Sequence, residues 1–317
     1  MGLVLGLSLR FSLSRVEAQT WGLSLWPLLL EVTIQPGKSL TQAYWLINQG
    51  GRDLYLTAVV VPFRPEGDQG QLRPLTLELD PEVKKLFRLT NSQIQLGQSF
   101  KLAANSRQQL VLKITPPATQ PEGDYYYLFL IKQAEEGEFL PASGGQSLIQ
   151  IGSPILITVT RSAQPLKQAA ISQFRAQPRW AKRWQQPIQF QLRVKNIGPH
   201  FFKPEGEITI LYWGRWPKAT LTLRPDNILA DSQRLIGCLK EDRPQPCQFW
   251  SWWPGYYQAR VEFRPDGQAE SLQVTTDFFL LPLEPFLGLI LILGLIKIRP
   301  RPLKLNLTKI GLKLNNN

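Results

Sequence analysis

Apolar residues in this chain come in short runs, and glycine, proline or asparagine interrupts the runs at short intervals. The clearest pattern lies at 188–194, where apolar residues alternate with polar ones: Ile188, Phe190, Leu192 and Val194 against Gln189, Gln191 and Arg193. A period of two places one set of side chains on each face of a strand. Because the runs are too brief for ordinary helices, the pattern predicts an all-β protein with many short strands.

The same order of features occurs twice along the chain, which predicts two sandwiches of related plan. The first copy holds predicted strands at 31–34, 43–47, 54–61, 109–115, 125–131 and 148–160. The second copy holds predicted strands at 188–194, 206–212, 259–263 and 272–276. We therefore place one β-sandwich domain at 19–161 and a second at 169–277, with the division near 161–168.

Two local motifs carry the repeat. One strand ends at Asn48-Gln49-Gly50 and its counterpart ends at Asn196-Ile197-Gly198. A later strand begins at Gly123-Asp124-Tyr125-Tyr126, and its counterpart begins at Pro254-Gly255-Tyr256-Tyr257. Asparagine and glycine accept positive φ angles at little cost, so we expect the strands to end there in turns.

The residues at 278–298 read FFLLPLEPFLGLILILGLIKI and predict a single C-terminal transmembrane helix. A bilayer core of roughly 30 Å needs about 20 helical residues. The run 286–296 is too short alone, so the span has to include 278–283, with Glu284 near the outer end. The alternative is a buried core helix.

A basic tail at 299–317 follows this segment, and no acidic residue occurs after Glu284. The positive charges nearest the span are Lys297, Arg299, Arg301 and Lys304. Positive charge flanks the cytoplasmic end of membrane helices. We therefore expect a single-pass protein of the cell membrane, with a cytoplasmic C-terminus and extracytoplasmic domains.

Export requires a leader, and residues 1–18 resemble a weak signal peptide. Residues 3–9 are apolar, and Val16-Glu17-Ala18 resembles a small-residue cleavage site, but Arg10 interrupts the stretch. The alternative is a truncated leader whose start lies upstream.

The asparagine–glycine strand end, the strand that begins Gly-Asp-Tyr-Tyr, and the apolar segment with its basic tail together resemble bacterial WxL-interacting-type surface proteins. The resemblance implies immunoglobulin-like, pilus-chaperone-like sandwich domains ahead of a membrane anchor, with peptidoglycan as a reported ligand. Its motifs are shared by many extracellular sandwiches, so no binding residue is carried over.

Composition excludes most catalytic chemistry. The 317 residues carry a net charge of +12, but part of this excess lies in the basic tail, so it does not call for a nucleic-acid partner. His200 is the only histidine, and there are two cysteines. We expect no enzyme, no metal and no cofactor. Glycosidase carboxylates lack a local motif, so an envelope glycosidase stays an outside alternative.

The two cysteines, Cys238 and Cys247, enclose a short polar loop. In an oxidising exterior they predict a disulfide worth about 2–3 kcal/mol from loop entropy. Two free buried thiols are the alternative.

Two tryptophan clusters are the candidate interaction surface. In 249–254, FWSWWP, we expect Trp250, Trp252 and Trp253 to fill a domain core, with exposure on a binding surface as the alternative. Trp180 and Trp184 lie among Arg179, Lys182 and Arg183, which favours a surface that contacts an anionic polymer or the membrane.

The sequence therefore predicts a membrane-anchored surface protein that binds a cell-wall polymer or another surface protein through its sandwiches. The alternative is a structural or assembly partner whose sandwich edge accepts a strand from a client protein.

Overall fold

The computed structural model describes residues 22–90, 93–134, 150–183 and 186–281. These residues form two compact units, and the all-β class is as predicted. Unit 1 comprises 1–169 together with the short segments 195–202 and 227–234, and unit 2 comprises 170–194, 203–226 and 235–317. The main division therefore falls one residue beyond the predicted linker, and the two short segments are a feature that the sequence pattern did not indicate.

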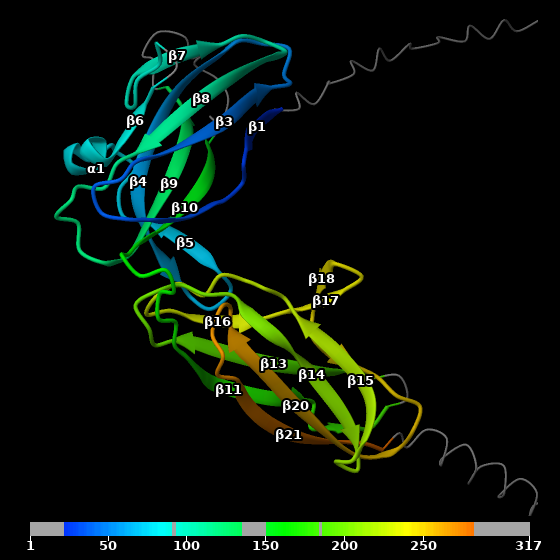
Figure 1. Ribbon diagram of the computed structural model, residues 1–317. Helices are drawn as coiled ribbons and strands as arrows, with labels where there is room; N and C mark the ends of the chain where they lie inside the picture. Colours follow the sequence, from blue (N-terminus) through cyan, green and yellow to red (C-terminus); the bar gives the residue numbers. More distant parts are fainter. Residues whose placement is uncertain (1–21, 91–92, 135–149, 184–185, 282–317) are drawn as a thin grey trace, which may run out of the picture. The chain divides into compact units, whose positions relative to one another are not determined.

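Unit 1 is built on two sheets (Figure 1). The first has the strand order β1 (Leu23–Trp26), β3 (Leu40–Asn48), β8 (Ser106–Ile114) and β6 (Phe87–Leu89). The second has the order β2 (Leu30–Ile34), β10 (Gln150–Val159), β9 (Gly123–Gln133), β4 (Leu54–Glu66) and β5 (Gln71–Pro74), with β7 (Ser99–Leu102) also paired to β4.

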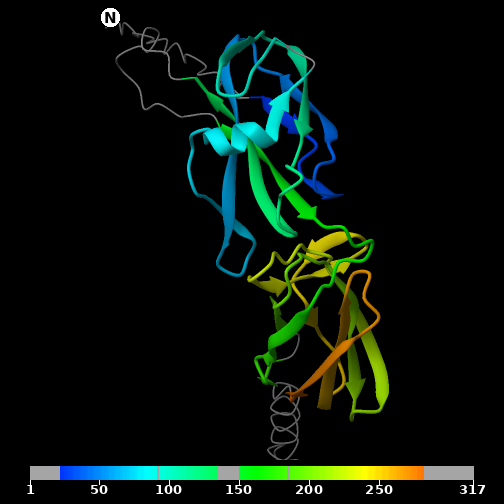
Figure 2. The ribbon, with the colours of Figure 1, turned by 60° about the vertical axis from the view of Figure 1, so that its left-hand side comes forward.

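A single short helix, α1 (Pro81–Leu86), is described in unit 1 and is coloured cyan in Figure 2. The Asp80 carboxylate accepts a hydrogen bond from the backbone N–H of Glu82 at 2.7 Å, and Pro81 occupies the first turn. Both are ordinary signals of a helix start. The strand pattern did not predict this helix.

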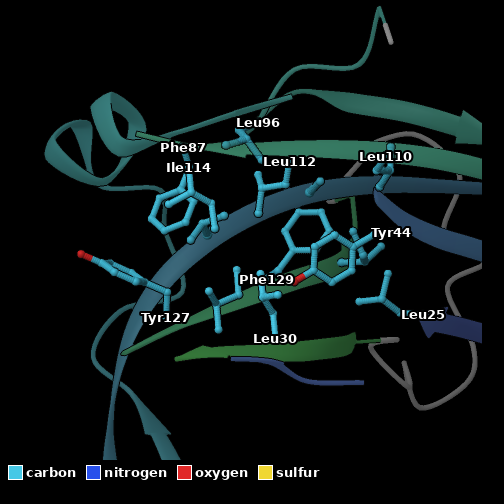
Figure 3. Close-up of a cluster of buried hydrophobic side chains, with 14 of the residues drawn as sticks. Leu25, Leu30, Tyr44, Phe87, Leu96, Leu110, Leu112, Ile114, Tyr127 and Phe129 are labelled. Atoms are coloured by element: carbon cyan, nitrogen blue, oxygen red, sulfur yellow. The ribbon is translucent and has the colours of Figure 1, made fainter. Parts of the chain in front are cut away.

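The main core of unit 1 lies between its two sheets (Figure 3). Tyr44 and Phe129 are fully buried, with ring centroids 4.8 Å apart. Burial raises the pKa of the Tyr44 hydroxyl to about 12, because the phenolate would lose its hydration. A second apolar cluster covers the other face of β4 and β9, which explains why both strands are continuously apolar rather than alternating.

Unit 2 repeats this plan. One sheet has the order β11 (Ala169–Gln177), β13 (Ile188–Asn196) and β16 (Gln233–Ile236), with β19 (Gln248–Phe249) also paired to β13. The other has the order β12 (Trp180–Ala181), β21 (Leu272–Leu280), β20 (Gly255–Pro265), β14 (Pro204–Tyr212), β15 (Trp216–Leu223), β17 (Cys238–Lys240) and β18 (Arg243–Gln245).

The repeat is visible in the topology. In each unit the first strand ends at a cis X-Pro bond, Trp26-Pro27 or Gln177-Pro178. The chain then crosses to the other sheet and pairs in parallel with the last strand, as β2 does with β10 and β12 with β21. Gly123 and Gly255 open β9 and β20 with φ angles of 147° and 143°. The predicted correspondence of these two strands therefore extends to their backbone.

The two asparagine strand ends are also alike, but for a different reason from the one predicted. None of Asn48, Gly50, Asn196 and Gly198 has a left-handed backbone. Instead, each asparagine side chain is buried and accepts a hydrogen bond from the glycine N–H two residues on, at 2.9 Å in both cases.

Each of these two amides also donates to backbone carbonyls. Asn48 bonds the carbonyls of Arg52 and Ala103, and Asn196 bonds those of His200 and Ile228, at 2.8–3.0 Å. The asparagine is therefore a side-chain bracket that ties a strand end to a loop distant in sequence.

The last strand corrects the boundary predicted for the membrane segment. β21 was expected to end at Thr276, but it continues to Leu280, and Phe278 and Leu280 are buried in the core of unit 2. These residues belong to the sheet because they alternate inward with the rest of the strand. Residues 282–298 of the predicted span lie outside the described residues, as do the leader 1–18 and the basic residues Lys297, Arg299, Arg301 and Lys304.

Within the described residues, no helix has the length and apolar character needed to span a bilayer.

Candidate functional site

One end of the large sheet of unit 2 carries most of the tryptophans of the chain. β14 and β21 finish there, β15 and β20 begin there, and β12 lies beside the end of β21 (Figure 1). The strand register brings their aromatic residues together. We call this set the aromatic end: Trp180, Tyr212, Trp213, Trp216, Trp250, Trp252, Trp253, Tyr256 and Phe279.

Neighbouring residues on β20 and β21 face opposite ways, so the rings form two layers. Tyr257 and Phe278 are opposite each other, fully buried and stacked, with centroids 5.4 Å apart. The next pair along, Tyr256 and Phe279, is only partly buried and lies on the other face. The inner pair belongs to the core, and the outer pair supports the surface.

Ring contacts run across five strands, although Tyr212 lies opposite the buried Tyr257 and therefore belongs to the inner face. Trp180 stacks on Phe279 at 4.4 Å, Phe279 lies 5.4 Å from Tyr256, and Tyr256 lies 6.1 Å from Trp213. Trp213 in turn lies 6.2 Å from Tyr212, which lies 6.3 Å from Trp216. Such centroid distances are typical of interacting aromatic pairs.

The six tryptophans of this set are exposed. Their exposed fractions are 50% for Trp180, 57% for Trp213, 56% for Trp216, 37% for Trp250, 55% for Trp252 and 66% for Trp253. The expectation that Trp250, Trp252 and Trp253 fill a core is therefore wrong. Only their neighbour Phe249 is buried, because the strand ends at that residue and the three tryptophans follow in a loop.

Hydrogen bonds hold this loop in place. The buried Tyr257 hydroxyl donates to the carbonyl of Trp253 at 2.8 Å and lies 3.0 Å from the hydroxyl of Ser251. Burial raises the pKa of Tyr257. A side chain at Gly255 would meet the Tyr212 ring at 2.8 Å, so glycine is required where the loop enters β20. The loop that carries the exposed tryptophans is therefore fixed to the core by hydrogen bonds.

Trp213 has an unusual backbone. The residues 213–215 connect β14 to β15, and the N–H of Arg215 donates to the carbonyl of Tyr212. Trp213 and Gly214 are the central residues of this turn, at φ angles of 52° and 67°. Two positive φ angles define the hairpin turn that favours Asn-Gly. A residue with a β-carbon pays roughly 1–2 kcal/mol for this conformation. A bulky exposed ring at this position is a cost to the fold, which points to a role outside it.

The surroundings of the aromatic end are basic. The sequence stretches 177–188, 210–219, 248–258 and 278–281 contain no Asp or Glu, but they contain five basic residues: Arg179, Lys182, Arg183, Arg215 and Lys218. All five are exposed. Lys218 lies over the Tyr212 ring, with its Nζ 5.4 Å from the centroid. Of the predicted surface residues, Trp184 lies outside the described residues.

Asp277 is the carboxylate nearest in sequence to the aromatic end, and it accepts hydrogen bonds from neighbouring side chains. The Tyr256 hydroxyl donates to it at 2.6 Å, and the Gln258 amide donates to the same oxygen at 3.3 Å. The bond to Asp277 raises the pKa of Tyr256, because losing its proton would place two negative charges together.

The predicted disulfide is confirmed. Cys238 and Cys247 are bridged and almost fully buried. They enclose the hairpin of β17 and β18, whose turn residues Glu241 and Asp242 have positive φ. The bridge ties the last strands of the large sheet to β19, directly before the exposed tryptophans.

An open hollow of about 330 Å³ lies beside this hairpin. Its lining includes Lys240, Gln245, Gln248 and Trp250.

His200 lies in a bend, and its partner was not predicted. Its Nδ1 lies 3.0 Å from a carboxylate oxygen of Asp124, within unit 1. Asp124 also accepts hydrogen bonds from the hydroxyls of Tyr126 and Thr158 and from the backbone N–H of Phe201. This buried carboxylate joins segments far apart in sequence, which no local motif could reveal. Among the described residues, no group of three or more His, Cys, Asp or Glu is arranged to hold a metal.

The edge of the large sheet is incompletely paired. Phe279 and Leu280 of β21 pair with β12, whereas the preceding seven residues, 272–278, pair with β20 on one side and with no described strand on the other. Phe279 donates its backbone N–H to the Arg179 carbonyl, and Leu281 donates to Ala181. By alternation, the peptide groups of Gln273, Thr275 and Asp277 point toward the open side.

The sequence matches no family model, and it matches no curated protein. Solved structures of pilus chaperones share its type of fold. The class 5 fimbriae chaperone CfaA is 9% identical, with 80% of this chain and 98% of that chain covered and a TM-score of 0.41.

The CsuC–CsuE chaperone–tip adhesion subunit complex of Acinetobacter baumannii pili is 13% identical, over 70% of this chain and 91% of that chain, with a TM-score of 0.36. The E. coli chaperone DraB is 14% identical, over 80% and 96%, with a TM-score of 0.33. At these values the likeness concerns the all-β sandwich type of fold and assigns no function.

Proposed function

We propose that this chain is a non-catalytic, membrane-tethered extracytoplasmic protein that binds a partner polypeptide by accepting one of its strands at the open edge of β21. The observation that supports this proposal is the unpaired stretch 272–278. An exposed row of peptide groups is a template for an incoming strand.

The composition of this edge favours pairing. Natural sheets blunt their edges with proline, bulges or lysine, and the stretch 272–278 contains no proline, lysine or arginine. Its pairing with β20 runs without a register shift. Leu272 and Val274 are half-buried on the same face as the buried Phe278, so apolar side chains of a client would extend the core.

The equivalent strand of unit 1 is a poorer acceptor. There β2 pairs with 155–159 of β10, which leaves only 150–154 without a described partner on that side. The backbone N–H of Thr160 donates to Ile34, so by alternation Pro154 faces the same side. Because proline lacks an N–H, this shorter edge offers fewer donors.

The tether rests on the sequence. The chain leaves the sheet at Leu281 and continues into the apolar run 286–296 and a basic tail. Association of the purified full chain with phospholipid vesicles, and its resistance to carbonate extraction, tests this part of the proposal. Full release by carbonate would contradict it.

Strand acceptance is tested by photo-crosslinking in the native membrane. A photoreactive amino acid at the exposed Gln273 should trap a polypeptide of defined mass. The matched control is Glu262, which is exposed and lies directly opposite Gln273 on β20, one strand away from the edge. Equal crosslinking from both positions would refute edge-specific binding.

A pair of variants at one position sharpens this test. Thr275→Pro removes an N–H that points to the open side and leaves the ladder with β20 intact, whereas Thr275→Ala keeps that N–H. We expect the proline variant to lose the crosslinked partner and the alanine variant to keep it. Loss in both would assign the contact to the side chain and not to strand pairing.

Binding of a wall polymer is a second candidate, favoured by the hollow beside Trp250. A tryptophan face beside the polar side chains of Lys240, Gln245 and Gln248 suits a sugar ring and its hydroxyl groups. Sedimentation of the full chain with purified wall material, compared with Trp250→Ser, tests it. Equal sedimentation of both proteins would remove this site.

A further inference from the structure

We propose that the aromatic end of unit 2 is a membrane-contact surface that sits in the headgroup region of a phospholipid bilayer. This inference rests on the membrane tether of the proposed function, but it does not depend on strand acceptance. It assigns the exposed tryptophans to the lipid surface.

The position of the rings is the first argument. Trp180 pairs with Phe279, and Leu281 donates its N–H to the neighbouring Ala181. The chain therefore leaves the fold between exposed aromatic residues. Only four residues separate Leu281 from the apolar run that begins at Phe286. A tether this short holds the aromatic end near the lipid surface.

The kind of side chain is the second argument. Tryptophan and tyrosine are the residues that gather at membrane interfaces, because each ring has an apolar body and a polar group. A surface evolved to pack against a protein core would carry leucine or phenylalanine as readily. Here the six exposed large rings are all tryptophan.

Charge is the third argument. The five exposed basic residues around the rings match the phosphate groups of phospholipids, and the local sequence stretches supply no carboxylate. The long stems of lysine and arginine allow their charges to reach the phosphate level while the rings lie deeper. The opposite end of the same sheet carries the carboxylates Glu205 and Asp266.

Trp213 supplies the fourth argument, because it stands where the backbone would favour asparagine. The turn conformation does not favour this side chain, whereas a ring at the sheet end is suited to insertion between headgroups. Replacing it therefore separates the requirements of the fold from those of the membrane.

The test uses the full chain reconstituted into phosphatidylcholine vesicles that contain a lipid brominated near the headgroup, which quenches tryptophan emission at short range. We expect quenching in the wild-type protein. The triple variant Trp213→Asn, Trp216→Ser, Trp253→Ser should lose about half of the quenched emission, since it removes three of the six exposed rings. Trp26→Phe is the matched control, because Trp26 is 63% exposed in unit 1.

The single variant Trp213→Asn guards against misfolding. It should keep or raise the thermal midpoint of the protein while the quenched emission falls. Vesicle flotation separates the possible failures. Flotation without quenching, or an equal loss of quenching in Trp26→Phe, would overturn the membrane-contact surface and leave the tether intact. Failure to float would overturn both.

Discussion

The two units share a plan but use aromatic residues differently. Unit 1 buries the rings of Tyr44, Phe87 and Phe129 between two sheets, and its Trp26 is 63% exposed. Unit 2 buries one layer, including Tyr257 and Phe278, and then places tryptophans outside it at one end of the sheet. The strand scaffold alone does not require exposed rings, because unit 1 does without such a cluster. The difference therefore separates what the sandwich needs from what unit 2 adds.

Removing a buried ring should destabilise either unit by a similar amount, and this is the largest expected effect on stability. Phe129→Ala and Phe278→Ala should each lower the free energy of unfolding by about 3–5 kcal/mol, because each leaves a cavity. Denaturant unfolding followed by circular dichroism measures the loss. A negligible effect of Phe278→Ala would mean that β21 does not complete the core of unit 2.

The disulfide belongs to unit 2 alone. The double change Cys238→Ser, Cys247→Ser should cost about 2–3 kcal/mol, because the unfolded chain gains the freedom of the open loop. Intact mass before and after reduction and alkylation establishes the bridge, and urea unfolding measures the cost. Alkylation of both thiols without reductant would contradict the bonded state.

Replacing the two bracket asparagines tests whether the repeated motif contributes equally to stability at both strand ends. Asn48→Ala and Asn196→Ala should each destabilise the protein by roughly 1–3 kcal/mol, because buried backbone groups lose their partners. Similar values from thermal unfolding would support equivalent roles at the two strand ends. A large cost at only one of them would limit the repeat to its sequence pattern.

Exposed tryptophans should matter little for stability. Trp253→Ser and Trp26→Phe should each change the free energy of unfolding by less than about 0.5 kcal/mol, in contrast to Phe278→Ala. Chemical unfolding monitored by circular dichroism avoids the change in tryptophan emission. If Trp253→Ser lowered the free energy of unfolding by several kcal/mol, the Trp253 ring would have to be part of the core.

The smallest effect concerns an ion pair of unit 1. Hydrogen bonds from Arg161 and Thr160 hold the pKa of Glu122 below its ordinary value of 4.5. The stabilisation is present above this value and is lost as the pH falls through the lower pKa of the folded state. Arg161→Gln should therefore weaken the decline of stability below about pH 4.5, as measured by thermal midpoints between pH 3 and 6 relative to Arg161→Lys.

Much of the fold was predictable because the sequence signals of a strand lie in residues that are neighbours along the chain. The alternation at 188–194 and the glycine before Tyr125 or Tyr256 depend on neighbouring residues alone, and these predictions match β13, β9 and β20. The disulfide was predictable because the two cysteines are separated by only nine positions and are the only cysteines in the chain.

The surface was less predictable, because exposure depends on where a strand ends. Trp250 and Phe249 are neighbours of similar character, yet one is exposed and the other is buried. Phe278 and Phe279 differ in the same way, since the strand continues through both and alternates. An apolar stretch therefore does not reveal whether it crosses a membrane or closes a sheet until its partner strand is known.

The sequence by itself determined the all-β class, the repeat, the bridge between Cys238 and Cys247, and the scarcity of catalytic side chains, because each depends on residue type or short spacing. Only the tertiary structure decided that tryptophans from separate loops form one surface, that β21 has an open edge, and that Asp124 meets His200. These features join residues that are far apart along the chain, and strand pairing is what brings them together.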